Sequence, residues 1–184
     1  MIDRKRAFDG IRPLFGKFDQ TQVNFFDGFF DEWERRGLTD LRWAAYMIAT
    51  VQHETAATMT PLEEYGKGKT KQYGKPDPVT GQTYYGRGYV QLTWKYNYAT
   101  AAGYVGADLV HHPERAMEPP IATKILFDGM IAGWFTGRAL RHFFTPTLTD
   151  WMNARRIING VDKAAKIAAK AVKYHAALKG ASGA

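Results

Sequence analysis

The stretch from Tyr65 to Gln82 constrains the fold of this chain more than any other. It is rich in glycine and lysine and contains Pro76 and Pro78. Proline removes a backbone donor and glycine weakens both helices and strands, so no regular element can cross this stretch unbroken. We predict a long surface loop here, of a length that is uncommon inside a compact domain. The fold must therefore be built from the segments on either side of it.

Two helical patterns precede the loop. Asp19 is a helix-capping residue, and an aromatic-rich run follows it over residues 23–33. Apolar residues then recur at three- and four-residue steps over 41–51, which predicts one buried helical face. We expect this second helix to be capped by Thr39 and to end within residues 54–57.

Further short elements follow the loop. We predict a short strand or hairpin arm at 84–93, then helices at 94–102 (capped by Thr93), 119–134, 150–158 and about 161–179. The chain shows no internal repeat and no linker. The pattern indicates a mainly α fold, a single domain over residues 1–184 with a small β or irregular portion around 62–92.

Composition excludes several classes of protein. The 184 residues include no cysteine, so disulfide scaffolds, cysteine zinc sites and thiol nucleophiles are impossible. No apolar run approaches the roughly 20 residues of a membrane span. The first residues lead into no apolar signal segment, so we expect a monomeric protein that starts in the cytosol and is not exported by that route.

The net charge of +7 is unevenly distributed. Residues 1–64 carry a net −3, the loop 65–82 carries +3, residues 83–154 carry +1 and residues 155–184 carry +6. Such asymmetry indicates an anionic partner, which charge alone leaves open between nucleic acid, an anionic membrane and an anionic polymer.

The predicted last helix carries much of this charge. Four lysines fall on one side of it and mainly apolar residues fall on the other; the lysines are Lys163, Lys166, Lys170 and Lys173. Such a basic amphipathic helix either docks on the core or is attracted to envelope polymers and outer-membrane lipid, and the two roles can coexist.

Two motif fragments fail on inspection. His53-Glu54 begins like a zinc-protease HExxH, but Ala57 stands where the second histidine belongs. Gly86-Arg87-Gly88 begins like a dinucleotide fingerprint, but Gln91 stands where the third glycine belongs. We therefore expect no metal and no cofactor.

A set of carboxylates remains. Glu54 is expected at the C-terminal end of an apolar helix, where the helix dipole and apolar surroundings both raise a carboxyl pKa, as a general acid requires. Glu63 and Glu64 follow on a separate segment and could activate water, the arrangement of an inverting glycosidase. Spacing alone leaves open that all three are ordinary surface glutamates.

Aromatic residues crowd the same region. Tyr65, Tyr73, Tyr84, Tyr85, Tyr89, Trp94, Tyr96 and Tyr98 surround the loop and the Gly86–Gly88 turn. Tyr and Trp rings suit the faces of sugars, but core packing and the stacking of nucleic-acid bases remain alternatives.

The motifs resemble glycoside hydrolase family 19, more narrowly its compact phage endolysins and putative chitinases. The matching residues, in order, are His53-Glu54-Thr55, Pro61 to Gly66, Tyr84 to Tyr98, and Ile157-Ile158-Asn159-Gly160. The resemblance implies a lysozyme-like, mainly helical α+β fold. It also implies inverting hydrolysis of a β-1,4-linked amino-sugar polymer.

The resemblance also implies roles for individual residues. Glu54 matches the general acid, Glu64 the general base and Thr93 the residue that holds the attacking water with the base. Glu63 occupies the variable position beside the base and stays open as an alternative. His53 is expected to orient the acid, and Arg87 to brace its loop. The expected substrate-binding residues are His53, Tyr85, Gln91, Trp94, Asn97 and Asn159.

Departures from the chitinase form favour the phage branch. Val161 follows Asn159-Gly160 where chitinases have a second glycine, the plant cysteines are absent, and the chain is shorter. We therefore expect an endolysin, a muramidase that cuts peptidoglycan for host lysis and waits in the host cytoplasm until released to the wall. Its partners would be peptidoglycan strands and, through the last helix, anionic envelope lipid, with no nucleic acid. A chitinase, and a non-enzymatic cationic module that binds glycan or nucleic acid, remain the alternatives.

Overall fold

The computed structural model describes residues 2–182 and is mainly helical. Its helices are α1 (Arg4–Ile11), α2 (Gln20–Arg35), α3 (Leu41–Glu54), α4 (Lys95–Val105), α5 (Pro119–Ala132) and α6 (Ala164–Ala181). The strands are β1 (Leu62–Glu63) and β2 (Arg87–Gly88). Short 3-10 turns complete the fold at η1 (Arg12–Leu14), η2 (Tyr65–Gly68), η3 (Gln72–Gly74), η4 (Pro113–Met117), η5 (Leu140–His142) and η6 (Asn153–Ile157).

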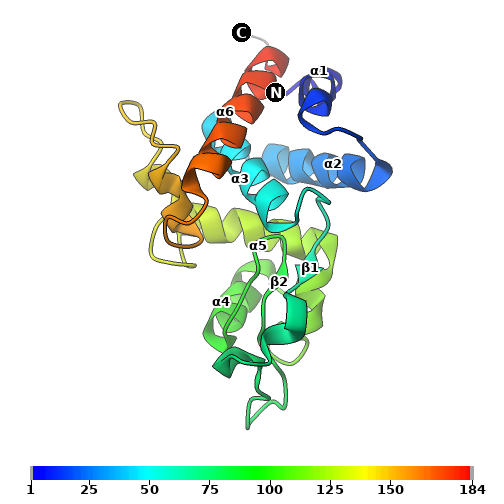
Figure 1. Ribbon diagram of the computed structural model, residues 1–184, viewed down its shortest axis with the longest axis vertical. Helices are drawn as coiled ribbons and strands as arrows, with labels where there is room; N and C mark the ends of the chain where they lie inside the picture. Colours follow the sequence, from blue (N-terminus) through cyan, green and yellow to red (C-terminus); the bar gives the residue numbers. More distant parts are fainter. Residues whose placement is uncertain (1, 183–184) are drawn as a thin grey trace.

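One part of the molecule is a cluster of helices around a phenylalanine-rich core. Helix α6 packs against α3 and α1, and α2 contributes four buried phenyl rings at Phe25, Phe26, Phe29 and Phe30. The two ends of the described chain meet, because the Asp3 N–H donates to the Ala181 carbonyl over 2.9 Å (Figure 1). The last helix is thus docked on the core through its apolar face, and its lysines remain outside.

Helix α5 joins this cluster to a second, smaller part. It contacts α2 on one side and α4 on the other, and Figure 1 shows it between the helix cluster and the part that holds the strands and α4. Helix α3 runs toward the strands and ends at Glu54. The arrangement places the C-terminal end of a buried helix opposite the hairpin.

The hairpin is minimal and braced from inside. Leu62 pairs with Gly88 and Glu63 with Arg87 in antiparallel register. The buried Arg87 guanidinium donates to the Thr83 carbonyl over 2.9 Å and lies 3.6 Å from the centre of the Tyr85 ring. The prediction that Arg87 braces this loop is confirmed.

Helix starts are the first place where the prediction of local structure was wrong. Helix α3 is capped by Asp40, whose carboxylate accepts from the Arg42 N–H, and not by Thr39. Thr93 does not cap α4, because Trp94 intervenes with φ +73° and turns the chain; the Thr93 hydroxyl donates to the Gln91 carbonyl instead.

Element lengths and types also differ from expectation. The strand expected at 84–93 reduces to Arg87–Gly88, and the helix expected at 150–158 is the 3-10 turn η6. Helix α1 was not predicted. Residues 65–82 form a loop with two short 3-10 turns, tied to α4 by the Asp77–Lys95 ion pair of 2.8 Å. Within residues 2–182, no helix is long and apolar enough to cross a bilayer.

Candidate active site

Glu54 is the last residue of α3, and its partner is Arg155. The Arg155 Nη1 donates to Glu54 Oε1 over 2.6 Å, and the two side chains are only 5% and 16% exposed. Arg155 lies on η6, and its Nε also donates to the Asp162 carbonyl over 3.2 Å. Within residues 2–182, the Oε2 atom of Glu54 makes no hydrogen bond, so one oxygen is held and the other is available.

His53 lies next to this pair but does not make its hydrogen bond. We expected His53 to orient the acid, whereas the contact to Glu54 comes from Arg155. Burial lowers the pKa of His53, and the nearby Arg155, Lys166 and Lys170 act in the same direction against Glu54. His53 is therefore a neutral imidazole at neutral pH, able to serve as a hydrogen-bond donor or acceptor.

Glu64 is held by the hairpin on both of its oxygens. The Tyr73 hydroxyl donates to Oε1 over 2.9 Å and the Gly86 N–H donates to Oε2 over 3.1 Å. The Glu64 N–H in turn donates to the Gly86 carbonyl over 2.7 Å. The carboxylate is fixed in orientation, and each oxygen keeps a lone pair for a water molecule. It borders a cavity of about 250 Å³ whose remaining lining comes from residues 65–71.

Glu63 is bonded to different partners from its neighbour. Its carboxylate accepts from the Tyr85 hydroxyl over 2.6 Å and lies 3.0 Å from Lys67 Nζ and 3.7 Å from Arg87 Nε. The hydrogen bond from Tyr85, with the charges of Lys67 and Arg87, lowers the pKa of Glu63. A carboxylate of lowered pKa is a weaker base, so these contacts favour Glu64 as the proton acceptor.

Tyr85 is not presented to a substrate. It is 5% exposed, its hydroxyl donates to Glu63, and its ring lies against the Arg87 guanidinium. The expectation that Tyr85 binds substrate is therefore wrong, because an aromatic residue that supports the hairpin cannot also face a sugar. The pattern of aromatic residues does not distinguish buried rings from exposed ones.

Three predicted residues form one connected turn beside Glu64. Gln91 donates to the Leu62 carbonyl over 3.0 Å, Thr93 to the Gln91 carbonyl over 2.8 Å, and Asn97 to the Thr93 carbonyl over 2.9 Å. A Cβ added at Gly86 would lie 2.8 Å from Gln91 Oε1 and 3.3 Å from the Glu64 Cβ, so both residues pack on this glycine. The Thr93 proton is already donated, which leaves its oxygen as an acceptor for a water.

Trp94 and Asn159 lie on the two sides of the site. Trp94 is 40% exposed, lies near the Tyr96 ring at 21° and meets the Tyr73 ring edge-on at 5.1 Å. Asn159 follows η6, is exposed, and accepts the Gly160 N–H over 2.8 Å.

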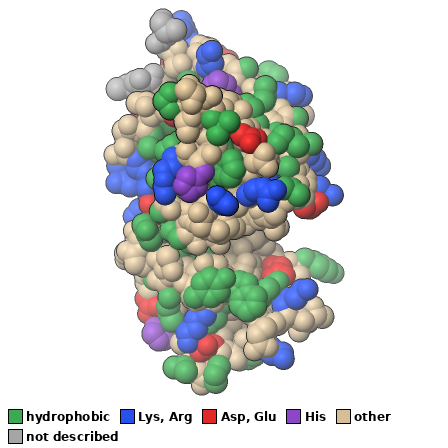
Figure 2. Space-filling model, turned by 90° about the vertical axis from the view of Figure 1, so that its left-hand side faces the viewer, with side chains coloured by type: hydrophobic (Ala, Val, Ile, Leu, Met, Phe, Trp, Pro, Cys, Tyr) green, Lys and Arg blue, Asp and Glu red, His purple; other side chains and the backbone are tan. Residues whose placement is uncertain are grey.

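The structure brings the predicted residues together in two groups. Glu54, His53 and Asn159 belong to the helix cluster, whereas Glu64, Gln91, Thr93, Trp94 and Asn97 belong to the hairpin part. Figure 2 shows a hollowed waist between these two parts of the molecule. Within residues 2–182, no group of three or more His, Asp or Glu is placed to hold a metal ion. Sequence reasoning missed Arg155 and Tyr73, the side chains that hold the two carboxylates.

Comparisons with known proteins agree with this geometry. The family model for glycoside hydrolase family 19, described as chitinase class I, matches residues 44–154. An endochitinase of Arabidopsis thaliana is 33% identical over 127 residues, covering 68% of this chain and 41% of the relative. Chitinase 3 of Oryza sativa is 38% identical over 102 residues, covering 47% and 32%. The chain thus spans less than half the length of these two curated relatives.

Solved structures show the same fold. Chitinase C from Streptomyces griseus superposes with a TM-score of 0.60 at 18% identity, covering 97% of this chain and 76% of that one. A bacterial family 19 chitinase superposes with a TM-score of 0.55 at 15% identity, covering 98% and 95%. The fold and the site define the class as a glycoside hydrolase. More particularly, the family match over residues 44–154 shows that the chain belongs to glycoside hydrolase family 19.

Proposed function

We propose that this protein hydrolyses β-1,4 glycosidic bonds of bacterial peptidoglycan by an inverting acid–base mechanism. One observation carries the proposal: two glutamates on separate parts of the fold are each held by their own partners. Glu54 is fixed by Arg155 at the end of α3, and Glu64 by Tyr73 and Gly86 on the hairpin. Two carboxyl groups of this kind can flank one bond and act on its opposite sides.

Each carboxyl group has one task in the proposed reaction. Protonated Glu54 donates its proton from Oε2 to the glycosidic oxygen as the bond to the anomeric carbon breaks. Ionised Glu64 takes a proton from a water that also donates to the Thr93 hydroxyl oxygen, and the water oxygen bonds to the anomeric carbon from the opposite face. The products are two sugar ends with inverted configuration at the cut. Exchange of protons with solvent returns both glutamates to their starting states.

Charge favours peptidoglycan over chitin as the polymer. The loop beyond Glu64 carries a net +3 and the last 30 residues carry +6, which suits an anionic wall polymer better than a neutral one. The phage-type motifs place the protein among endolysins, which act on the wall of a host cell from within. Chitin is the second candidate, since the relatives named above are chitinases.

The test is to identify the bond that is cut. Purified peptidoglycan and chitin are digested separately, and the products are analysed by mass spectrometry for new reducing ends. We expect ends on N-acetylmuramic acid from peptidoglycan and little release from chitin. Release from chitin alone would make the protein a chitinase, and release from neither would favour a binding module.

Variants assign the two carboxyl groups. We expect Glu54→Gln and Glu64→Gln each to lose roughly 10²–10⁴-fold in activity while keeping the folded circular dichroism spectrum. Glu63→Gln is the matched control, one residue from Glu64, and should keep most of the activity. If Glu63→Gln is inactive and Glu64→Gln is active, the base is Glu63.

A further inference from the structure

A second cavity lies next to the acid side of the site and has no assigned role. It has a volume of about 250 Å³ and is lined by Pro13, Leu14, Gln52, Lys170, Lys173 and Tyr174. Gln52 comes from α3, the prolyl-leucyl pair from η1, and the other three from α6. Its size is below the roughly 300–1,000 Å³ of drug-sized ligand sites, so it suits a group the size of one amino acid.

The cavity is positively charged and lacks a built-in counterion. None of its lining residues is acidic. Among residues 2–182, neither Lys170 nor Lys173 has a carboxylate within 4 Å, whereas many of the other basic side chains do. Burial, together with the neighbouring Lys166, lowers the pKa of Lys170. An ammonium group that is partly buried without a partner is stabilised by a bound anion.

Neutral polar groups complete the lining. Gln52 is 5% exposed, and its side chain makes no hydrogen bond within the described part of the chain. Tyr174 is fully buried, and its hydroxyl has no hydrogen-bond partner. Buried polar groups are normally satisfied, so two unsatisfied ones beside a pair of lysines indicate a ligand that is polar as well as anionic.

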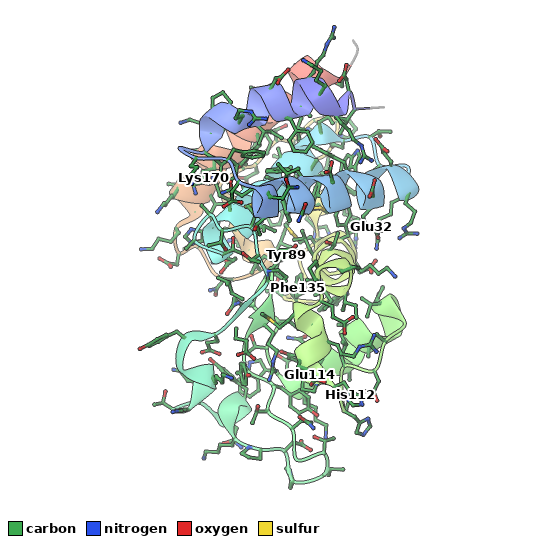
Figure 3. All side chains as sticks on the ribbon, turned by 90° about the vertical axis from the view of Figure 1, so that its right-hand side faces the viewer. Glu32, Tyr89, His112, Glu114, Phe135 and Lys170 are labelled. Carbon is green, nitrogen blue, oxygen red and sulfur yellow. The ribbon has the colours of Figure 1, made fainter. Side chains whose placement is uncertain are left out.

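The cavity is adjacent to the proposed acid but displaced from it. Gln52 precedes Glu54 by two residues, a rise of about 3 Å along α3 and a rotation of about 200° around it. His53 lies between them and is close enough to Lys166 and Lys170 for their charges to lower its pKa. Figure 3 shows Lys170 on the same side of the molecule as the segment that follows β1. The cavity is thus placed for a group that branches off the bound polymer.

We propose that this cavity is an anion subsite that takes a carboxylate of the peptide stem carried by peptidoglycan sugars. Lys170 and Lys173 bind the carboxylate, and the Gln52 amide and Tyr174 hydroxyl bind its neighbouring amide groups. This inference rests on the proposed function and deepens it. Chitin carries no such branch, so the subsite would distinguish the two polymers. A flat anionic membrane would contact the outer row of lysines and would not enter a concave site.

Binding is tested first with a soluble stem fragment. The probe is N-acetylmuramyl-L-alanyl-D-isoglutamine, titrated by calorimetry, with diacetylchitobiose as the neutral sugar. We expect Lys170→Gln and Lys173→Gln each to weaken the stem fragment roughly tenfold and to leave diacetylchitobiose unchanged. Lys179→Gln, an exposed lysine on α6 outside the cavity, is the matched control and should bind as the unaltered protein does.

Three outcomes would overturn the proposal. The stem fragment may fail to bind the unaltered protein, it may bind the Lys170 and Lys173 variants equally well, or inorganic phosphate at equal concentration may displace it. Displacement by phosphate would show a general anion site. Lys173 is exposed and retains its aliphatic stem on substitution by glutamine, so Lys173→Gln will fold and provides a result even if Lys170→Gln does not.

Activity separates this proposal from the previous one. On peptidoglycan with intact stems, Lys173→Gln should raise KM severalfold with little change in kcat. On glycan strands stripped of stems by an amidase, it should match the unaltered enzyme. Loss on both polymers would contradict the subsite. If neither polymer is cut but the stem fragment binds through Lys170 and Lys173, the subsite stands and the proposed function falls.

Discussion

At the scale of single residues, the orientation of Glu54 depends on Arg155. The guanidinium joins Glu54 Oε1 to the Asp162 carbonyl, a bridge that a lysine cannot reproduce. We expect Arg155→Lys to lower kcat roughly tenfold and Arg155→Met roughly 100-fold, with KM within about twofold, because misplacement of a reacting group acts mainly on the chemical step. Steady-state kinetics on peptidoglycan measure this split. Arg156→Met, at the exposed neighbouring arginine, is the control, and an Arg155→Met enzyme with normal kcat would show that Arg155 does not position the acid.

Motifs predict the catalytic pair from sequence but not its partners. His53-Glu54 and Glu64 stand in ordered patterns that can be identified by comparison with a family. Arg155 lies 101 residues from Glu54, and only the packing of η6 against the end of α3 brings them together. Tyr85 shows the converse limit, since its sequence context suggests a sugar-binding ring and the fold buries it against Glu63. Long-range side-chain pairs are decided by tertiary structure, which local pattern does not encode.

At the scale of elements, the hairpin turn depends on the absence of a side chain at Gly86. A Cβ there would approach Gln91 Oε1 to 2.8 Å and the Glu64 Cβ to 3.3 Å. We expect Gly86→Ala to fold with a loss of about 1–2 kcal/mol and to lose at least tenfold in kcat, because it displaces both the base and Gln91. Thermal unfolding and kinetics measure the two effects. Gly103→Ala in α4, where a Cβ meets nothing within 4 Å, is the control and should keep full activity. Equal activity in the two variants would show that Gly86 is not needed for the geometry.

Helices α2 and α5 are joined by a buried charge network that makes stability depend on pH. Arg36 donates to both Glu32 and Asp128 at 2.6 Å. Burial acts to raise the pKa of Glu32, but hydrogen bonds from Arg35 and Arg36 outweigh it and the net pKa is lowered. This contribution to stability is therefore complete above the unfolded pKa of about 4.5 and is lost as pH falls through the lower folded pKa.

The variant Glu32→Gln tests this network. We expect it to lower the free energy of unfolding by about 2 kcal/mol at pH 7, since charged hydrogen bonds are lost. Below pH 4.5 the difference from the unaltered protein should shrink, because Glu32 then becomes protonated as well. Urea unfolding at a series of pH values measures it, with Glu34→Gln on the same helix as control. A constant difference between pH 3 and 7 would contradict the assignment.

Element existence was more predictable than element boundaries. The periodic stretches that became α2, α3, α5 and α6 carry a clear apolar face, and each is present. Caps and short elements differ because they depend on single contacts, such as the Asp40 side chain at the start of α3. Helix α1 has few apolar residues, and it is stabilised by packing on α6, which a local pattern cannot show.

At the scale of the whole molecule, charge is separated between the parts that make up the site. The first 64 residues supply both proposed catalytic glutamates and carry a net −3, whereas the following loop and the last 30 residues carry +3 and +6. Helix α6 is docked through its apolar face, so insertion of that face into lipid would require the helix to leave the core. What remains accessible is the lysine face, which can attract an anionic polymer at a distance.

Long-range attraction of this kind predicts a salt dependence that differs between substrates. Because the Debye length falls from about 30 Å at 0.01 M to about 10 Å at 0.1 M salt, lysis of anionic walls should slow severalfold over this range. Hydrolysis of neutral sugar oligomers should stay constant. Replacing the exposed loop residues Lys69 and Lys71 by glutamine should reduce wall lysis and flatten its salt dependence, whereas replacing Lys5 and Lys17 changes the net charge equally and should have little effect. If both double variants behave alike, total charge matters and its location near Glu64 does not.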